Sequence, residues 1–101
     1  MTHPSRHGEY KMPGGKLVVM DLDVEHGHLA NVQLSGDFFL EPDSALDSLN
    51  RALHGQPETV DESELIASLR GALADDVMMY GISIEAIAVT VRRALNRESE
   101  E

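Results

Sequence analysis

Histidine is the side chain in this sequence best suited to hold a metal ion or to move a proton. Five histidines occur, and four of them form two close pairs, His3 with His7 and His26 with His28. Metal sites that use such pairs add carboxylates or cysteines at characteristic spacings. Neither pair has such neighbours in the sequence, so we expect solvated histidines and no metal ligand.

A glycine-rich turn that carries a lysine is the second candidate site. Gly14, Gly15 and Lys16 precede an apolar run. A nucleotide-binding loop places its glycines after a strand and before a helix, whose amide groups meet the phosphates. The order here is reversed. Two alternatives stay open: the glycines allow tight entry into a strand, which the local sequence favours, or the turn presents Lys16 to an anion on a partner.

The segment Gly36-Asp37-Phe38-Phe39 is the third candidate. Asp37 is typical of a turn in which a carboxylate binds nearby amide groups. Phe38 and Phe39 are the two phenylalanines of the chain, and neighbouring residues of a strand face opposite sides. One of them can therefore enter the core. The other must pack under a loop, against the helices' edge, or against another chain, which makes an interface and simple intramolecular packing equal alternatives.

No residues in the sequence resemble a nucleophile with its base. Ser35, Ser44 and Ser83 stand where turns or helix caps are expected, and no paired carboxylates lie in an apolar setting. We therefore assign no catalytic residue. The residues by themselves indicate a binding or accessory module.

The strands that must position these residues come first in the chain. Apolar and polar residues alternate from Lys16 to Glu25 and again from Ala30 to Ser35, with Ala30, Val32 and Leu34 expected to face the core. The His26-Gly27 pair between the two runs predicts a two-residue turn and hence an antiparallel hairpin. Residues 38–40 predict a short third strand.

Three helices are predicted to follow, because apolar residues then recur at helical spacing. Their expected caps and ends are, in chain order, Asp43 or Ser44 and Gly55, then Asp61 with Glu64 and a fading end from Asp75 to Tyr80, then Ser83. Strands followed by helices indicate an α+β fold, in which about three helices pack against a small antiparallel sheet made of the hairpin and the short third strand.

Length and charge narrow the class of protein further. The chain has 101 residues, of which 42% are hydrophobic, which is enough for one domain. The net charge is −10, although residues 1–16 hold three basic residues and one acidic residue. Such an acidic chain is not expected to bind nucleic acid or an anionic membrane surface. We expect a flexible basic leader over residues 1–15, one α+β domain over 16–97 and an acidic tail over 98–101.

Cysteine is absent from the chain. This excludes disulfides, thiolate catalysis and cysteine-ligated iron–sulfur clusters. The absence is compatible with a reducing cytoplasm, which is the expected location.

Several segments together resemble the C-terminal accessory domain of lipoate–protein ligases. They are Lys11-Met-Pro-Gly-Gly-Lys-Leu17, the hairpin that follows it, Gly36-Asp37-Phe38-Phe39, the helix after Pro42, and Gly81-Ile82-Ser83 before the last helix. The resemblance implies a fold similar to that of sulfur-transfer and iron–sulfur scaffold proteins. The cysteines of those relatives are missing here, so their chemistry does not carry over.

The resemblance also implies a function. In some archaea this domain is a separate polypeptide, and a chain that begins with Met and ends soon after the third helix is typical of that form. Such an accessory subunit forms a heterodimer with a catalytic subunit and is required to make lipoyl-adenylate from lipoate and ATP. Lipoate, ATP and Mg would then act at the catalytic subunit, with no cofactor on this chain.

The eventual acceptor would be the lipoyl domain of a 2-oxoacid dehydrogenase or a glycine cleavage protein. The residues expected to contact the partner or a substrate loop are Gly14, Gly15, Lys16, Gly36, Asp37, Phe38 and Phe39. Two alternatives stay open: a small ligand- or metal-binding module with the same fold, and the C-terminal part of a fused ligase.

Overall fold

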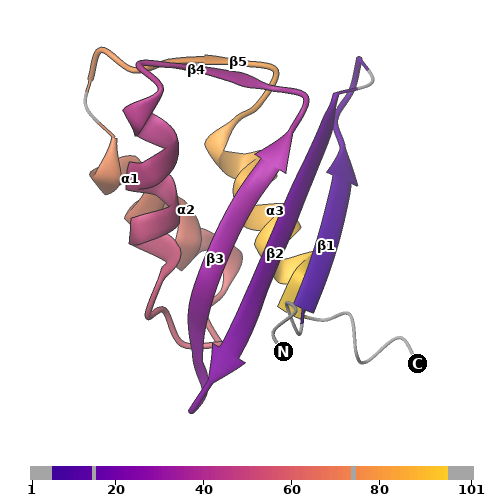
Figure 1. The fold of residues 1–101 in the computed structure, drawn as a ribbon, viewed down its shortest axis with the longest axis vertical. Coiled ribbons are helices and arrows are strands. Elements are labelled where there is room, and N and C mark those ends of the chain that lie inside the picture. Colours follow the sequence, from indigo (N-terminus) through magenta and orange to yellow (C-terminus); the bar gives the residue numbers. More distant parts are fainter. Residues whose placement is uncertain (1–5, 15, 74, 96–101) are drawn as a thin grey trace.

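The computed structural model describes residues 6–14, 16–73 and 75–95. Within these residues the elements are, in chain order, β1 (Arg6–Lys11), β2 (Leu17–Glu25), β3 (His28–Gly36), β4 (Phe39–Glu41), α1 (Ser44–Leu53), α2 (Glu62–Ala72), β5 (Met78–Tyr80) and α3 (Ile84–Leu95). The helices lie on one face of an antiparallel sheet ordered β1-β2-β3 (Figure 1). The predicted α+β fold is confirmed.

The predicted hairpin of β2 and β3 is present with its predicted turn. Glu25 pairs with His28, so His26 and Gly27 alone connect the strands. Their φ angles are 53° and 80°. Two successive positive φ angles are typical of the turn whose twist matches that of the flanking strands.

A β-bulge in β3 was not predicted. Asp21 pairs with Gln33 but Asp23 pairs with Ala30, so β3 holds one extra residue between these pairs. Asn31 lies in this bulge with φ 51°, and its side-chain amide donates a hydrogen bond of 2.9 Å to Asp23. The bulge shifts the alternation along β3. As a result Leu29 is buried, in addition to the expected Ala30 and Leu34, while Val32 is half-buried.

The third strand of this sheet is β1, which corrects the expectation of a loose leader. Arg6–Lys11 pairs with β2, from Arg6 opposite Leu22 to Lys11 opposite Leu17. Helix α3 packs on the strand so closely that a β carbon on Gly8 would lie 2.5 Å from the backbone nitrogen of Ala94. The domain body therefore holds residues 6–11. Residues 1–5 and the expected tail lie outside the described residues.

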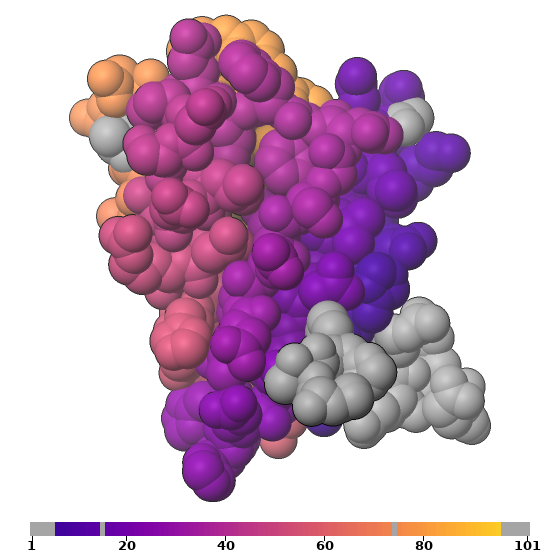
Figure 2. All heavy atoms as spheres, in the orientation of Figure 1, coloured from indigo at the N-terminus to yellow at the C-terminus, as the bar shows by residue number. Residues whose placement is uncertain are grey.

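The segment predicted as the third strand of the hairpin sheet belongs to a separate two-stranded ribbon. Phe39 of β4 pairs with Tyr80 of β5, and Glu41 pairs with Met78. The second helix was expected to fade across 75–80, but α2 ends at Ala72 and a strand follows. The ribbon lies above α1, at the end of the molecule that is uppermost in Figures 1 and 2.

The helix caps agree with the sequence at two of three positions. Asp61 accepts a hydrogen bond from the Glu64 amide at 2.9 Å, and Glu64 accepts one from the Asp61 amide at 3.3 Å, which completes the predicted capping box. The Ser83 hydroxyl accepts a hydrogen bond of 3.0 Å from the Ala86 amide. Asp43 precedes α1 as expected, but it is itself helical and its side chain makes no capping hydrogen bond.

The core lies between the sheet and the helices. Its largest fully buried aliphatic side chains come from both layers and are Met20, Leu22, Leu29, Leu49, Leu53, Leu65, Leu69 and Ile87. Among the described residues, none of the helices combines the length and apolar character that a membrane span requires.

Candidate functional site

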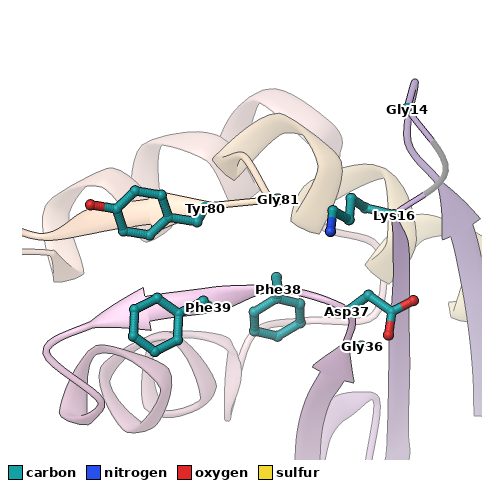
Figure 3. A pocket seen from close by; sticks show the side chains of 8 residues that line it. All are labelled: Gly14, Lys16, Gly36, Asp37, Phe38, Phe39, Tyr80 and Gly81. Atoms are coloured by element: carbon teal, nitrogen blue, oxygen red, sulfur yellow. The ribbon is translucent and has the colours of Figure 1, made fainter.

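A hollow of about 550 Å³ lies between the ribbon and the starting end of β2. Its walls come from segments that are distant in the sequence, as Figure 3 shows. The lining residues are Gly14, Lys16, Gly36, Asp37, Phe38, Phe39, Tyr80 and Gly81. The hollow is open to the surface and has both apolar and charged walls.

The turn at Gly36 is held against the start of β2 by backbone contacts. The Asp37 amide donates a hydrogen bond of 2.9 Å to the carbonyl oxygen of Leu17. Gly36 has φ 142°, and a β carbon there would lie 2.1 Å from the same oxygen. Glycine is therefore required for the two segments to approach this closely.

Gly81 keeps the opposite wall open. Its φ is 80°, and a β carbon would lie 3.1 Å from the carbonyl oxygen of Asp37 and 3.5 Å from the Cγ atom of Lys16. A side chain at position 81 would therefore crowd the space between β5 and the turn at Asp37. The shape of the hollow depends on glycine on both sides.

Aromatic rings form one end of the hollow. Phe38 is half-buried and packs against the core, whereas Phe39 is 55% exposed. The rings of Phe39 and Tyr80 lie side by side, with their centroids 5.8 Å apart and a tilt of 37°. The expectation that only one phenylalanine enters the core is confirmed. The other pairs with a tyrosine at the surface.

The other end of the hollow carries charge. The exposed side chain of Lys16 extends toward the gap between Gly81 and Asp37, and the Asp37 carboxylate is turned away from the phenylalanine rings (Figure 3). Among the residues that the structure describes, no carboxylate forms an ion pair with Lys16. The ammonium group is thus available to an anion from outside the chain.

More basic residues lie around a second, adjoining hollow that shares Asp37 with the first. Lys11, Arg93 and the acidic Glu9 also line it, and its volume is about 500 Å³. Arg93 lies with its guanidinium carbon 5.0 Å from the centre of the Tyr10 ring and donates a hydrogen bond of 3.1 Å to the carbonyl oxygen of Glu9. The two hollows together are lined by three basic side chains, those of Lys11, Lys16 and Arg93, and by two acidic ones, those of Glu9 and Asp37.

Six of the seven residues predicted to contact a partner line the first hollow, and Gly15 lies outside the described residues. Tyr80 and Gly81 were not predicted as site residues. The apolar run before Tyr80, followed by a glycine, was the available signal, but such a run also suits the end of a helix. Together the walls offer an ammonium group, a carboxylate and aromatic rings, which are suited to binding.

The histidines are separated in the structure. His7 lies on the outer face of the sheet, with Nδ1 2.5 Å from the Asp21 carboxylate and Nε2 2.8 Å from the Glu9 carboxylate. Hydrogen bonding to Asp21, and secondarily to Glu9, raises the pKa of His7 above 6.5. His26 lies in the hairpin turn, His28 is the first residue of β3, and His3 lies outside the described residues. In the described ranges, no cluster of three or more histidine or acidic side chains is placed to hold a metal ion.

Comparison with known proteins identifies a similar fold. Neither a protein-family model nor a curated protein matches the sequence. The fold does match that of a solved structure. That structure is described as an archaeal lipoylation system, a bi-partite lipoate protein ligase and its E2 lipoyl domain, from Thermoplasma acidophilum. This chain shares the fold of one of its chains. The TM-score is 0.65 at 21% sequence identity, and the match covers 91% of this chain and 96% of the other.

Proposed function

We propose that this protein is the non-catalytic accessory subunit of a lipoate–protein ligase. With a separate catalytic subunit it would form a heterodimer that activates lipoate with ATP to lipoyl-adenylate. Lipoate, ATP and Mg would bind to the catalytic subunit. The product would then serve a lipoyl domain of a 2-oxoacid dehydrogenase or a glycine cleavage protein, in the cytoplasm.

The observation that carries this proposal is the extent of the structural match. It takes in nearly the whole of both chains, and the other chain belongs to an archaeal lipoylation system made up of a bi-partite lipoate protein ligase and its E2 lipoyl domain. The sequence motifs that resemble a ligase accessory domain, from Lys11 to Ser83, lead to the same kind of complex.

The site has the features of a contact surface. The glycine turns and aromatic residues of the hollow lie on one end of the domain, where a second protein can reach all of them. An accessory domain placed over an adenylation site can exclude water and order substrate loops, which lowers the barrier to the reaction without any catalytic residue of its own.

Pyrophosphate release from ATP and lipoate tests the proposal. The catalytic subunit is assayed with and without this protein, and transfer from preformed lipoyl-adenylate to a lipoyl domain is measured in parallel. Strong dependence of pyrophosphate release on this protein, with transfer much less affected, supports an activating subunit. Full activity of the catalytic subunit alone contradicts the proposal and leaves only the fold assignment.

A further inference from the structure

The outer face of the ribbon of β4 and β5 carries three large apolar side chains and one carboxylate, that of Glu41. Among the described residues, the large hydrophobic side chains with high exposure are Phe39 at 55%, Met78 at 50% and Tyr80 at 47%. Met78 and Tyr80 are two residues apart on one strand and so share a face, and Phe39 is directly opposite Tyr80. Single exposed apolar residues are common on proteins, but an apolar cluster of this kind marks interaction sites.

The inner face of the ribbon explains why this outer face is free. Leu40 is buried at 5% exposure, and the half-buried Met79 opposite it also packs against the core. A two-stranded ribbon is marginally stable alone and depends on such packing. Because the inner face supplies that packing, the outer residues are not needed to hold the ribbon in place.

The apolar face continues into the hollow. Phe39 and Tyr80 belong to both, and Lys16 lies at the far end of the same hollow (Figure 3). A molecule lying along this surface meets aromatic rings first and an ammonium group next. The chain as a whole carries a net charge of −10, and Asp37 lines the same hollow, so the attraction for a carboxylate on a partner comes from the Lys16 ammonium group, which has no ion pair among the described residues.

From this arrangement we propose that the outer face of the ribbon and the adjoining hollow bind one segment of the catalytic subunit. Apolar side chains of that segment pack on Phe39, Met78 and Tyr80, and an acidic side chain next to them pairs with Lys16. The inference rests on the proposed function and adds the docking surface and the chemistry of its partner. The ribbon supplies most of the affinity, and the lysine fixes the direction in which the segment lies.

Binding to the purified catalytic subunit tests the inference with full-length protein. The dissociation constant is measured by calorimetry for the wild type, for Phe39→Ser combined with Tyr80→Ser, and for Lys16→Glu. We expect the double variant to bind at least about tenfold more weakly, because exposed aromatic anchors dominate such interfaces. We expect Lys16→Glu to weaken binding as well. Wild-type binding should weaken with salt, and Lys16→Ala should show a smaller salt dependence.

Matched controls separate this surface from general effects. Arg51→Glu makes the same charge change at an exposed position of α1 and should bind like the wild type. Circular dichroism and thermal unfolding show whether each variant keeps the fold. The exposed positions of Phe39 and Tyr80 make large losses of stability unexpected.

The outcomes distinguish the two proposals. A wild-type protein that neither binds the catalytic subunit nor stimulates it overturns the proposed function and this inference together. A wild type that binds and stimulates, with a folded double variant of equal affinity, overturns the docking surface alone. Sedimentation analysis adds a third outcome: self-association of the wild type that the double variant abolishes, with binding to the catalytic subunit unchanged, would assign this face to a second copy of the chain instead.

Discussion

Gly36 and Leu17 touch through their backbones at the base of the hollow. A β carbon on Gly36 would lie 2.1 Å from the carbonyl oxygen of Leu17, which also accepts the 2.9 Å hydrogen bond from Asp37. This contact joins the end of β3 to the start of β2. It thereby sets the distance between Lys16 and the aromatic residues that follow Gly36.

Replacement of Gly36 by alanine should therefore destabilise the protein and disturb the hollow. The strained φ of 142° and the clash with a backbone atom should together lower the free energy of unfolding by about 1–3 kcal/mol. Urea unfolding measures the change. Gly14→Ala is the control, because Gly14 has φ 96° but nothing within 4 Å of a β carbon. Its loss should be smaller, and equal losses would show that the contact with Leu17 is unimportant.

Replacement of Gly8 by alanine should loosen the contact between β1 and α3. The added carbon would meet the backbone of Ala94 and Thr90, which cannot move as a flexible side chain can. Overpacking of this kind lowers the free energy of unfolding by about 1–3 kcal/mol.

Gly71→Ala is the opposing control for Gly8→Ala. Gly71 is exposed within α2, and a β carbon there meets nothing within 4 Å. Alanine should stabilise this helix by up to about 1 kcal/mol. Thermal unfolding of the two variants should give shifts of opposite sign, and shifts of the same sign would contradict the packing described here.

Replacement of the residue before a helix should lower the stability of the protein at Asp61 but not at Asp43. Asp61→Ala deletes the acceptor of the capping box and should lower the free energy of unfolding by about 1 kcal/mol. Asp43 occupies the equivalent place before α1 without a side-chain capping hydrogen bond, so Asp43→Ala should have little effect. Chemical denaturation of both variants checks the difference. Similar losses would mean that Asp43 also caps its helix in solution.

The stability contributed by His7 should fall as pH rises. Hydrogen bonds to Asp21 and then Glu9 raise the pKa of His7 in the folded state above 6.5. The contribution is therefore complete below the pKa of the unfolded chain and is lost as pH rises through the higher folded value. Unfolding of the wild type and His7→Gln at a series of pH values gives the difference directly. The pH dependence of that difference should disappear when Asp21→Asn and Glu9→Gln are also present.

Replacement of Lys16 by alanine should reduce lipoate activation without unfolding the protein. Lys16 is exposed and has no ion-pair partner within the described part of the chain, so its loss should change stability by less than about 0.5 kcal/mol. Pyrophosphate release at limiting concentrations of this protein should fall. Arg51→Ala removes a cation from α1 and serves as the control. Unchanged pyrophosphate release with Lys16→Ala would remove Lys16 from the functional surface.

The sequence predicted correctly those elements whose formation depends on residues that are close together in the chain. The His26-Gly27 turn depends on positive φ angles, which glycine adopts easily. The capping box at Asp61 and the Ser83 cap depend on side chains that bind neighbouring backbone amides. Six of the expected contact residues also line one hollow. The hairpin sets the place of Lys16 relative to Gly36, because Val18 pairs with Gly36 and so brings the two ends together.

The missed elements depend on partners far along the chain. The sequence of β1 is polar and contains glycine, and it becomes a strand because β2 pairs with it and α3 covers it. The apolar run before Tyr80 suits a helix or a strand, and pairing with β4 decides for the strand. Since Tyr80 reaches the site only through this pairing, its role was not visible in the local pattern.

The packing of β1 against α3 has a consequence for synthesis of the protein. Arg6 donates a hydrogen bond of 3.0 Å to the carbonyl oxygen of Leu95, across 89 positions of the chain. At a translation rate of roughly 5–20 residues per second, roughly 4–18 s separate the synthesis of β1 from the completion of α3, which packs on it. During that time the apolar side chains of β2 lack α3, and exposed strands of this kind aggregate. Synthesis of α3 is thus the step after which the sheet of the nascent chain can be covered and protected from aggregation.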